Sequence, residues 1–183
     1  MPHSRWRLFD FLVRSDGKIV FLIADVAGKG MPAALLVMNL QARIQALAET
    51  ADELTQIVSR LNRMIKDVCP ANRFVTCFLA VLDPRSGELA WVNAGHEPAI
   101  ILRHYGATER LGAGGPPLGV FRDADHHCDR CSLEPGDRLL LVTDGVTEAR
   151  GPGNEDFAET RREPAGRAVQ PSSRGGSKSS PCS

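Results

Sequence analysis

Hydrophobic residues along the chain follow two periods, one helical and one extended. Residues 19–24 form a continuous apolar run, which is typical of a buried strand. A Gly-rich turn follows over residues 25–31, and Pro32 lies where a helix can begin. Apolar side chains then recur with helical spacing from Ala33 to Leu47. These patterns predict a strand, a tight turn and a helix in succession.

A second helix is predicted directly after the first. Thr50 and Glu53 have the T-x-x-E spacing of a capping box. Apolar positions recur on one face from Leu54 to Val68. Two helices joined by so short a link form an antiparallel pair.

The period changes after Pro70. Residues 74–82 form a long β-rich run, residues 83–87 have the composition of a turn, and further strands are predicted at 89–94 and 99–102. A Gly/Pro-rich loop at 111–119 precedes one more buried strand at 138–143. Because strands follow strands and the helices come as a pair, the pattern predicts an α+β fold with antiparallel sheets covered by helices.

Composition narrows the class of protein. The chain has 183 residues, of which 43% are hydrophobic, and this suits one globular domain. Lys plus Arg and Asp plus Glu both number 22, so the chain lacks the field of a general nucleic-acid binder. No apolar run approaches the ~20 residues that cross a bilayer. No long apolar stretch follows the basic first residues, so we expect no secretory signal. The odd number of cysteines, five, favours a reducing cytoplasm.

The last 26 residues differ from the rest. Residues 158–183 hold five basic and two acidic side chains, and Val169 is their one large aliphatic residue. Such a segment buries too little apolar surface to offset its ordering entropy. We therefore expect a folded domain over residues 8–157 and a disordered tail over 158–183. A solvated end is favoured over a tail that binds nucleic acid or acidic lipid.

Two carboxylates stand at the ends of predicted strands. Asp25 and Asp144 each follow a buried run, and each is followed closely by glycine, which lets a ligand approach the backbone. On neighbouring strands they could share hard divalent cations, since magnesium and manganese prefer carboxylate, carbonyl and water ligands. The alternative is that each aspartate only caps a turn or helix.

Other metal and phosphate motifs are incomplete. Gly28-Lys29 would need glycine at position 23 to form a P-loop, and that residue is Ile23. Cys128 and Cys131 follow two histidines, but no second ligand pair exists, so a zinc site is not favoured.

Four stretches resemble the conserved blocks of one family. They read IADVAGKGMPAAL at 23–35, NAGHEPA at 93–99, PLGV at 117–120 and LLLVTDGVTEA at 139–149. Together, and in this order, they resemble the SpoIIE-like (stage II sporulation protein E-type) phosphatases of the PPM, or protein phosphatase 2C-like, group. Four ordered blocks are far more specific than one, and they favour a metal-binding role of Asp25 and Asp144 over capping.

The resemblance implies an αββα sandwich, in which two antiparallel sheets are flanked by helices, with two Mn²⁺ or Mg²⁺ ions at one edge. It implies hydrolysis of phosphoserine or phosphothreonine on a protein. Asp25 would bridge the metals with help from the Val26 carbonyl, and Asp144 would hold the second ion; these two aspartates are the expected catalytic residues. The expected cleft-lining residues are Gly28, Gly30, His96 and Gly145.

The resemblance also implies a partner. The usual substrates of the family are phosphorylated anti-sigma-factor antagonist proteins, and no nucleic acid or membrane is expected. The helix pair resembles the family's regulatory switch element, and a homodimer through this pair is compatible with that role.

The sequence departs from the family pattern at both ends, so the fold is expected to be incomplete there. The position of a metal-binding Asp, three residues before Asp10, is occupied by Arg7, and the last strand with its final metal-binding Asp has no counterpart. A guanidinium cannot ligate a cation; it could pair with Asp25 or bind a phosphate. We therefore expect weak activity, with a catalytically defective phosphoprotein-binding module or a nonfunctional fragment as alternatives.

Overall fold

The computed structural model describes residues 6–28, 30–50, 53–68, 73–112 and 114–143. Its helices are α1 (Met31–Thr50) and α2 (Leu54–Val68). Its strands are β1 (Trp6–Val13), β2 (Ile19–Val26), β3 (Val75–Leu82), β4 (Glu88–Ala94), β5 (Ala99–Leu102), β6 (Thr108–Leu111), β7 (Asp129–Ser132) and β8 (Arg138–Leu140). The predicted boundary at 157/158 and the predicted tail lie outside the described residues.

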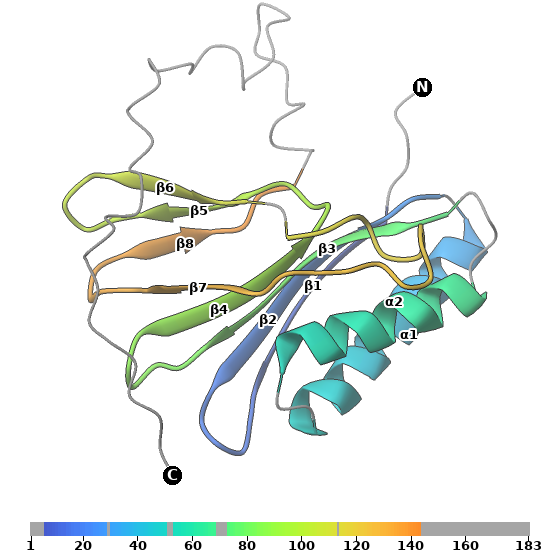
Figure 1. Cartoon of the computed structure of the whole chain (residues 1–183), viewed down its shortest axis with the longest axis horizontal. Helices are drawn as coiled ribbons and strands as arrows, with labels where there is room; N and C mark the ends of the chain where they lie inside the picture. Colours follow the sequence, from blue (N-terminus) through green and yellow to red (C-terminus); the bar gives the residue numbers. More distant parts are fainter. Residues whose placement is uncertain (1–5, 29, 51–52, 69–72, 113, 144–183) are drawn as a thin grey trace, which may run out of the picture. The chain divides into compact units, whose positions relative to one another are not determined.

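Two antiparallel sheets form the body of the fold. The five-stranded sheet has the order β1-β2-β3-β4-β7, and the three-stranded sheet has the order β6-β5-β8. The helices lie side by side along one face of the five-stranded sheet, α1 against β1 and β2 and α2 against β3 and β4 (Figure 1). The α+β class and the two antiparallel sheets are confirmed, while the helices described cover only one outer face.

The alternation of side chains in β2 separates two cores. Val20, Leu22, Ala24 and Val26 belong to the core between this sheet and the helices. The intervening side chains, among them Ile23, belong to the second core, which joins the two sheets through Phe78 and Trp91 on one side and Ile101 on the other. Asp25 continues this second series, so its side chain points to the inter-sheet face at the end of the strand.

The boundary between the two helices differs from the prediction. The first helix runs through Thr50, so Thr50 does not open the second helix as its capping box predicted. The Glu53 carbonyl instead accepts hydrogen bonds from the Gln56 and Ile57 amides at the start of α2. The antiparallel helix pair itself is confirmed.

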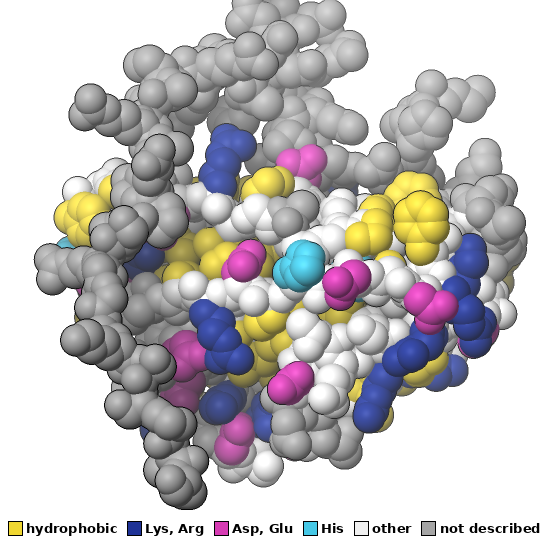
Figure 2. All heavy atoms as spheres, viewed as in Figure 1, with side chains coloured by type: hydrophobic (Ala, Val, Ile, Leu, Met, Phe, Trp, Pro, Cys, Tyr) yellow, Lys and Arg dark blue, Asp and Glu magenta, His cyan; other side chains and the backbone are white. Residues whose placement is uncertain are grey.

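The surface mixes charges of both signs with hydrophobic side chains (Figure 2). Exposed apolar side chains gather on the edge strand β1, at Phe9, Phe11 and Val13, and on α1, at Met31 and Met38. None of the helices within the described ranges is both long and apolar enough to cross a bilayer.

Candidate functional site

The candidate site begins with a row of three residues across neighbouring strands. Arg7 on β1 pairs in register with Asp25 on β2, and Asp25 pairs with Thr76 on β3. Residues directly opposite one another in an antiparallel sheet point to the same face. All three side chains therefore share the inter-sheet face at the end of the sheet where β2 finishes.

Asp25 is buried and paired with an arginine. Its side chain is only 5% exposed, and its Oδ1 lies 3.4 Å from Nε of Arg7, whose side chain is 46% exposed. A buried carboxylate without a counter-charge is costly, so the guanidinium compensates Asp25 inside the fold. Of the two options that the sequence left for Arg7, the structure has the ion pair with Asp25.

His96 reaches the same row from the loop after β4. Its Nδ1 lies 3.2 Å from Oγ1 of Thr76, and its backbone amide donates to Oδ1 of the buried Asn93 at 2.8 Å. Gly95 pairs with Cys77 on β3, which brings His96 alongside Thr76. His96 therefore lies one strand away from Asp25, and its predicted place in a cleft stays a prediction.

The NAGH and PLGV stretches meet at this end of the sheet. Gly95 has a φ of 69°, and a Cβ at this position would lie 2.7 Å from Cγ of Pro117. Leu118 exchanges two backbone hydrogen bonds with Val75 at the start of β3. Only glycine meets both demands at position 95, so the two stretches lock together beside β3.

The turn after Asp25 passes under another arginine. A Cβ at Gly28 would lie 3.4 Å from Nε of Arg73, and the Ala27 amide donates to the Phe74 carbonyl at 3.0 Å. Gly30 then accepts hydrogen bonds from the Ala33 and Ala34 amides at the start of α1. Gly28 and Gly30 therefore lie in the connection from Asp25 to α1, with the Arg73 guanidinium over the first of them.

Three of the four family-like stretches converge here, and the fourth is described only in part. Leu139 and Leu141 of the last stretch pack on the inter-sheet core. Asp144 and Gly145 lie outside the described residues, so their predicted roles stay predictions.

The described residues do not fit a pair of divalent metal ions. They contribute the Asp25 carboxylate, which already contacts Arg7, and the backbone carbonyl of the buried Val26. Asp10, on the opposite face of β1, accepts hydrogen bonds from Gln41 and Gln45 of α1. Nowhere in the described ranges do three His, Cys, Asp or Glu side chains gather as metal ligands, near Cys128 and Cys131 or elsewhere. One carboxylate with a guanidinium on it is a poor ligand set for two cations.

Sequence reasoning missed Thr76 and Arg73. Thr76 is the one polar side chain in the apolar run from Phe74 to Leu82, and that interruption at a strand end was the available signal. Arg73 carried no signal, because only the fold brings it over Gly28.

A hollow of the described fold lies at the opposite end of the five-stranded sheet. Its volume is about 490 Å³, and its charged lining includes two ion pairs, Arg14 with Asp16 and Arg130 with Glu88. Neither Asp25 nor His96 lines it. We place the candidate site at Asp25, where the polar side chains converge on a buried carboxylate, and not at this hollow.

Solved structures share this fold. The phosphatase domain of SpoIIE from Bacillus subtilis, solved with a fragment of its regulatory domain, matches with a TM-score of 0.71 at 18% identity, over 84% of this chain and 44% of that one. The RsbU and RsbW domains of Rv1364c from Mycobacterium tuberculosis match with a TM-score of 0.70 at 26% identity, over 81% and 42% of the two chains.

Sequence comparisons point to the same family. Phosphoserine phosphatase RsbU of Bacillus subtilis (strain 168) is 35% identical over 139 residues, which are 75% of this chain and 42% of that protein. Phosphoserine phosphatase RsbP of the same organism is 28% identical over 77% of this chain and 36% of its own length. The chain thus spans less than half the length of these relatives. The family model of stage II sporulation protein E (SpoIIE) matches residues 15–175, and the chain belongs to this family.

Proposed function

We propose that the chain is a protein serine/threonine phosphatase domain that acts on phosphoserine or phosphothreonine, with weak turnover in this form. The observation that carries the proposal is the buried strand-end carboxylate Asp25, set beside Thr76 and His96 in a fold shared with phosphoserine phosphatases. The weak turnover follows from Arg7, because its guanidinium contacts the carboxylate that the family resemblance assigns to the metals.

The proposed substrate is a phosphorylated regulatory protein of the anti-sigma-factor antagonist type. Support comes from the similarity to RsbU and to a solved chain that joins an RsbU domain to an RsbW domain. The proposed metal is Mn²⁺ or Mg²⁺; RsbX, which shares the fold at 16% identity, was solved in complex with magnesium. A cytoplasmic location is proposed from the cysteine usage, and the three described cysteines are free thiols.

The chain's own residues have separable tasks in this proposal. The hydrogen bond between Thr76 and His96 fixes the imidazole ring, and the pair with Arg7 holds the Asp25 carboxylate in place. The Arg7 side chain is 46% exposed, and in this proposal it also contacts a phosphate oxygen of the substrate.

The test of the proposed function is hydrolysis of a phosphoserine peptide with and without Mn²⁺, in the wild type and in Asp25→Asn. We expect slow Mn²⁺-dependent hydrolysis that Asp25→Asn abolishes. Asp16→Asn is the matched control, because Asp16 lies in the turn between β1 and β2, away from the site. Full activity in Asp25→Asn would refute the proposed site.

The Arg7–Asp25 pair favours one alternative function, a phosphoprotein-binding module without turnover. A domain whose metal-binding carboxylate is held by an arginine can keep a docking surface after its chemistry is lost. Binding of the phosphopeptide in the presence of EDTA, without release of phosphate in Mn²⁺, would identify this alternative.

A homodimer through the helix pair is proposed from the outer face of α1. Met31, Leu35 and Met38 are exposed there at helical spacing, whereas the buried side of the helix packs on the sheet. Sedimentation velocity should show a dimer that Met38→Lys converts to a monomer. A wild-type chain that sediments as a monomer at high concentration contradicts this arrangement.

A further inference from the structure

The outer strand β1 exposes a row of apolar side chains on its inter-sheet face. Phe9, Phe11 and Val13 are 62%, 63% and 61% exposed, and the alternation of a strand places them on the same face as Arg7. Phe21, which pairs with Phe11 from β2, packs on the inter-sheet core and is half-buried. The core therefore thins out before it reaches β1. A contiguous apolar row of this kind is typical of an interaction surface.

The same strand is an open edge of the described sheet. In the described strand order β1 has β2 on one side only, and the two strands pair without interruption from Trp6 to Val13. The strand contains no proline or lysine and no β-bulge, which are features that protect natural edges from added strands. β1 therefore has the features of a strand that can accept another one.

Backbone groups on β1 point to this open edge. The amide of Phe11 donates to Oδ1 of Asp10, its neighbour on the same strand, and so points away from β2. Because backbone groups alternate in direction along a strand, those of Phe9 and Val13 point to the open edge as well. The residues that expose their apolar side chains are thus the residues whose backbone can pair with an added strand.

We propose that β1 docks an extended segment of the phosphorylated substrate, which adds an antiparallel strand to this edge. The proposal rests on the proposed function for the identity of the partner as a phosphoprotein. The segment packs alternate apolar side chains on Phe9, Phe11 and Val13, and its phosphoserine lies opposite Arg7. In the antiparallel register, the apolar residues stand two, four and six positions before the phosphoserine.

Charge determines the end of the row at which the phosphate lies. Arg7 begins the row, its side chain is 46% exposed, and its guanidinium lies beside Asp25. Guanidinium groups bind phosphate oxygens through charge-assisted hydrogen bonds. The phosphate contacts the exposed side of Arg7 and leaves the ion pair with Asp25 in place. A phosphate opposite Phe9 or Phe11 would instead lose water without gaining a counter-charge.

One face of the strand accounts for the specificity of this docking. On the other face, Asp10 accepts hydrogen bonds from Gln41 and Gln45 of α1, so that face is already occupied. From Arg7 to Val13 the strand extends about 20 Å, which a segment of about seven residues matches. The preferred substrate segment therefore alternates apolar and other residues and ends in phosphoserine.

Fluorescence anisotropy of a labelled peptide, with the full chain in EDTA, tests the docking apart from metal-dependent hydrolysis. The first probe is Val-Thr-Val-Thr-Val-Thr-phosphoserine. The second, Thr-Val-Thr-Val-Thr-Val-phosphoserine, has the same composition, but with its phosphoserine at Arg7 its valines point to the opposite face. We expect the first peptide to bind about tenfold more tightly. Equal affinities, or no binding of either peptide, would overturn the proposal.

Phe11→Thr tests the apolar row. Threonine favours a strand, and the phenylalanine is 63% exposed, so the fold should persist. We expect the first peptide to bind about tenfold more weakly. Tyr105→Thr is the matched control, because Tyr105 is 65% exposed in the turn between β5 and β6, and it should leave affinity unchanged. Equal losses in both variants would overturn the proposal.

Arg7→Gln tests the position of the phosphate. The variant should weaken binding of the phosphorylated peptide about tenfold and leave binding of the same peptide with unmodified serine unchanged. An equal loss for both peptides would remove the phosphate from Arg7 and overturn the register.

Amide hydrogen exchange of the wild-type chain guards against a variant that fails to fold. The amides of Phe9 and Val13 gain partners from an added strand, so saturation with the first peptide should slow their exchange about tenfold or more. The amide of Tyr105 should exchange at an unchanged rate. Unchanged exchange along β1 with the peptide bound would overturn strand addition.

Sedimentation velocity without peptide tests the other occupant of the row, a second copy of the chain. A wild-type dimer that Phe11→Thr dissociates would assign the row to self-association and overturn the proposal. A sedimentation coefficient that Phe11→Thr leaves unchanged supports docking of a substrate segment.

Phosphate release in Mn²⁺, measured separately, distinguishes this proposal from the proposed function. If the first peptide docks through Phe11 and no phosphate is released, the docking surface stands and the enzymatic role falls. If the wild type and Phe11→Thr hydrolyse both peptides with equal kcat/KM, the enzymatic role stands and the docking surface falls.

Discussion

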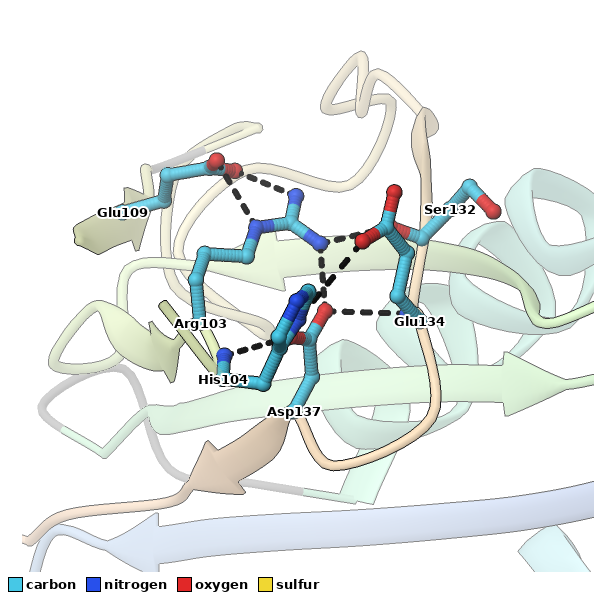
Figure 3. Close-up of polar contacts among 6 residues, drawn as sticks. All are labelled: Arg103, His104, Glu109, Ser132, Glu134 and Asp137. Atoms are coloured by element: carbon cyan, nitrogen blue, oxygen red, sulfur yellow. Dashed lines mark hydrogen bonds and ion pairs between the residues drawn. The ribbon is translucent and has the colours of Figure 1, made fainter. Parts of the chain in front are cut away.

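Two of the arginine–carboxylate arrangements in the described fold, one at each sheet, differ in character. On the five-stranded sheet, Nε of Arg7 lies 3.4 Å from Oδ1 of Asp25. On the three-stranded sheet, Arg103 at the end of β5 donates two hydrogen bonds to Glu109, of 2.8 and 2.7 Å, and one of 2.7 Å to Asp137 (Figure 3). The Arg7 side chain is 46% exposed, whereas the Arg103 side chain is only 10% exposed.

The carboxylate at the Arg103 cluster is also satisfied from the backbone. The Asp137 carboxylate accepts hydrogen bonds from the backbone amides of Glu134 at 2.9 Å and His104 at 2.8 Å. Arg103 donates a further hydrogen bond to the Ser132 carbonyl. These bonds tie the loop after β7 and the start of β8 to the hairpin of β5 and β6 (Figure 3). The cluster therefore stabilises the three-stranded sheet.

The pKa values of the two carboxylates reflect the hydrogen bonds in this cluster. The pKa of Asp137 lies well below its ordinary value, first because the Glu134 amide donates to it and then because the His104 amide and Arg103 do. The hydrogen bond from Arg103 likewise lowers the pKa of Glu109. The comparison teaches that burial of the guanidinium among short hydrogen bonds, and not the presence of an ion pair alone, marks an arginine as structural.

The largest expected effect is on the closed cluster. Arg103→Gln removes the donors that join Glu109 to Asp137, and the Arg103 side chain is only 10% exposed. We expect the melting temperature of the chain to fall by more than about 5 °C. Scanning calorimetry at pH 7 measures it.

Arg130→Gln is the control for the closed cluster. Arg130 pairs with Glu88 on the exposed surface, where an ion pair contributes about 0–1 kcal/mol. Its removal should shift the melting temperature only slightly. Equal falls in melting temperature for Arg130→Gln and Arg103→Gln would mean that the hydrogen bonds around Arg103 stabilise the fold no more than an exposed ion pair does.

The next effect is a dependence of stability on acid pH. Asp137 and Glu109 have lowered pKa values in the folded chain, so below about pH 4.5 the unfolded chain binds more protons than the folded one. Stability from this cluster is therefore present above the ordinary carboxyl pKa values and is lost as pH falls through the lowered ones. The difference in melting temperature between wild type and Asp137→Asn should narrow as the pH falls from 7 to 3; a difference that stays constant contradicts the assignment.

The sequence predicted the elements that bury apolar faces. The two cores contain apolar side chains of both helices and of residues 19–24, 74–82 and 89–94. These elements were predicted because hydrophobic periodicity reflects burial. The first strand was missed because its Phe9 and Phe11 are exposed on the edge, where pairing rests on the backbone. The four-residue strands β6 and β7 were missed for the same reason, being short, polar edges of their sheets.

The sequence predicted the main carboxylate of the candidate site but not the side chains around it. Asp25 stands out because glycines follow a buried strand, and this is a property of the chain alone. Thr76 and Arg7 become its neighbours through strand register, which a one-residue slip would have changed. The pairing of Arg7 with Asp25 was one of two options from the sequence, and only the register decided between them.

A smaller effect concerns the residue between Asp25 and His96. Thr76→Val removes the hydroxyl that contacts Nδ1 of His96, and a hydrogen bond of this kind contributes about 1 kcal/mol. We expect the melting temperature to fall by about 2–4 °C. The ring-nitrogen NMR signals of His96 should also shift, because its Nδ1 loses a partner, whereas those of His104 should stay unchanged. Thr76→Ser keeps the hydroxyl and should restore both; failure to do so would assign the effect to packing.

The smallest expected effect on stability is at Arg7, and it completes the comparison with Arg103. Arg7→Gln removes the charge beside Asp25 at a half-exposed edge, and the new amide can still donate to Asp25. The metal-free chain should lose less than about 1 kcal/mol, a fall in melting temperature below about 2–4 °C. Arg103→Gln should lower the melting temperature more than Arg7→Gln does. Equal losses at the two arginines would mean that Arg7 is as structural as Arg103.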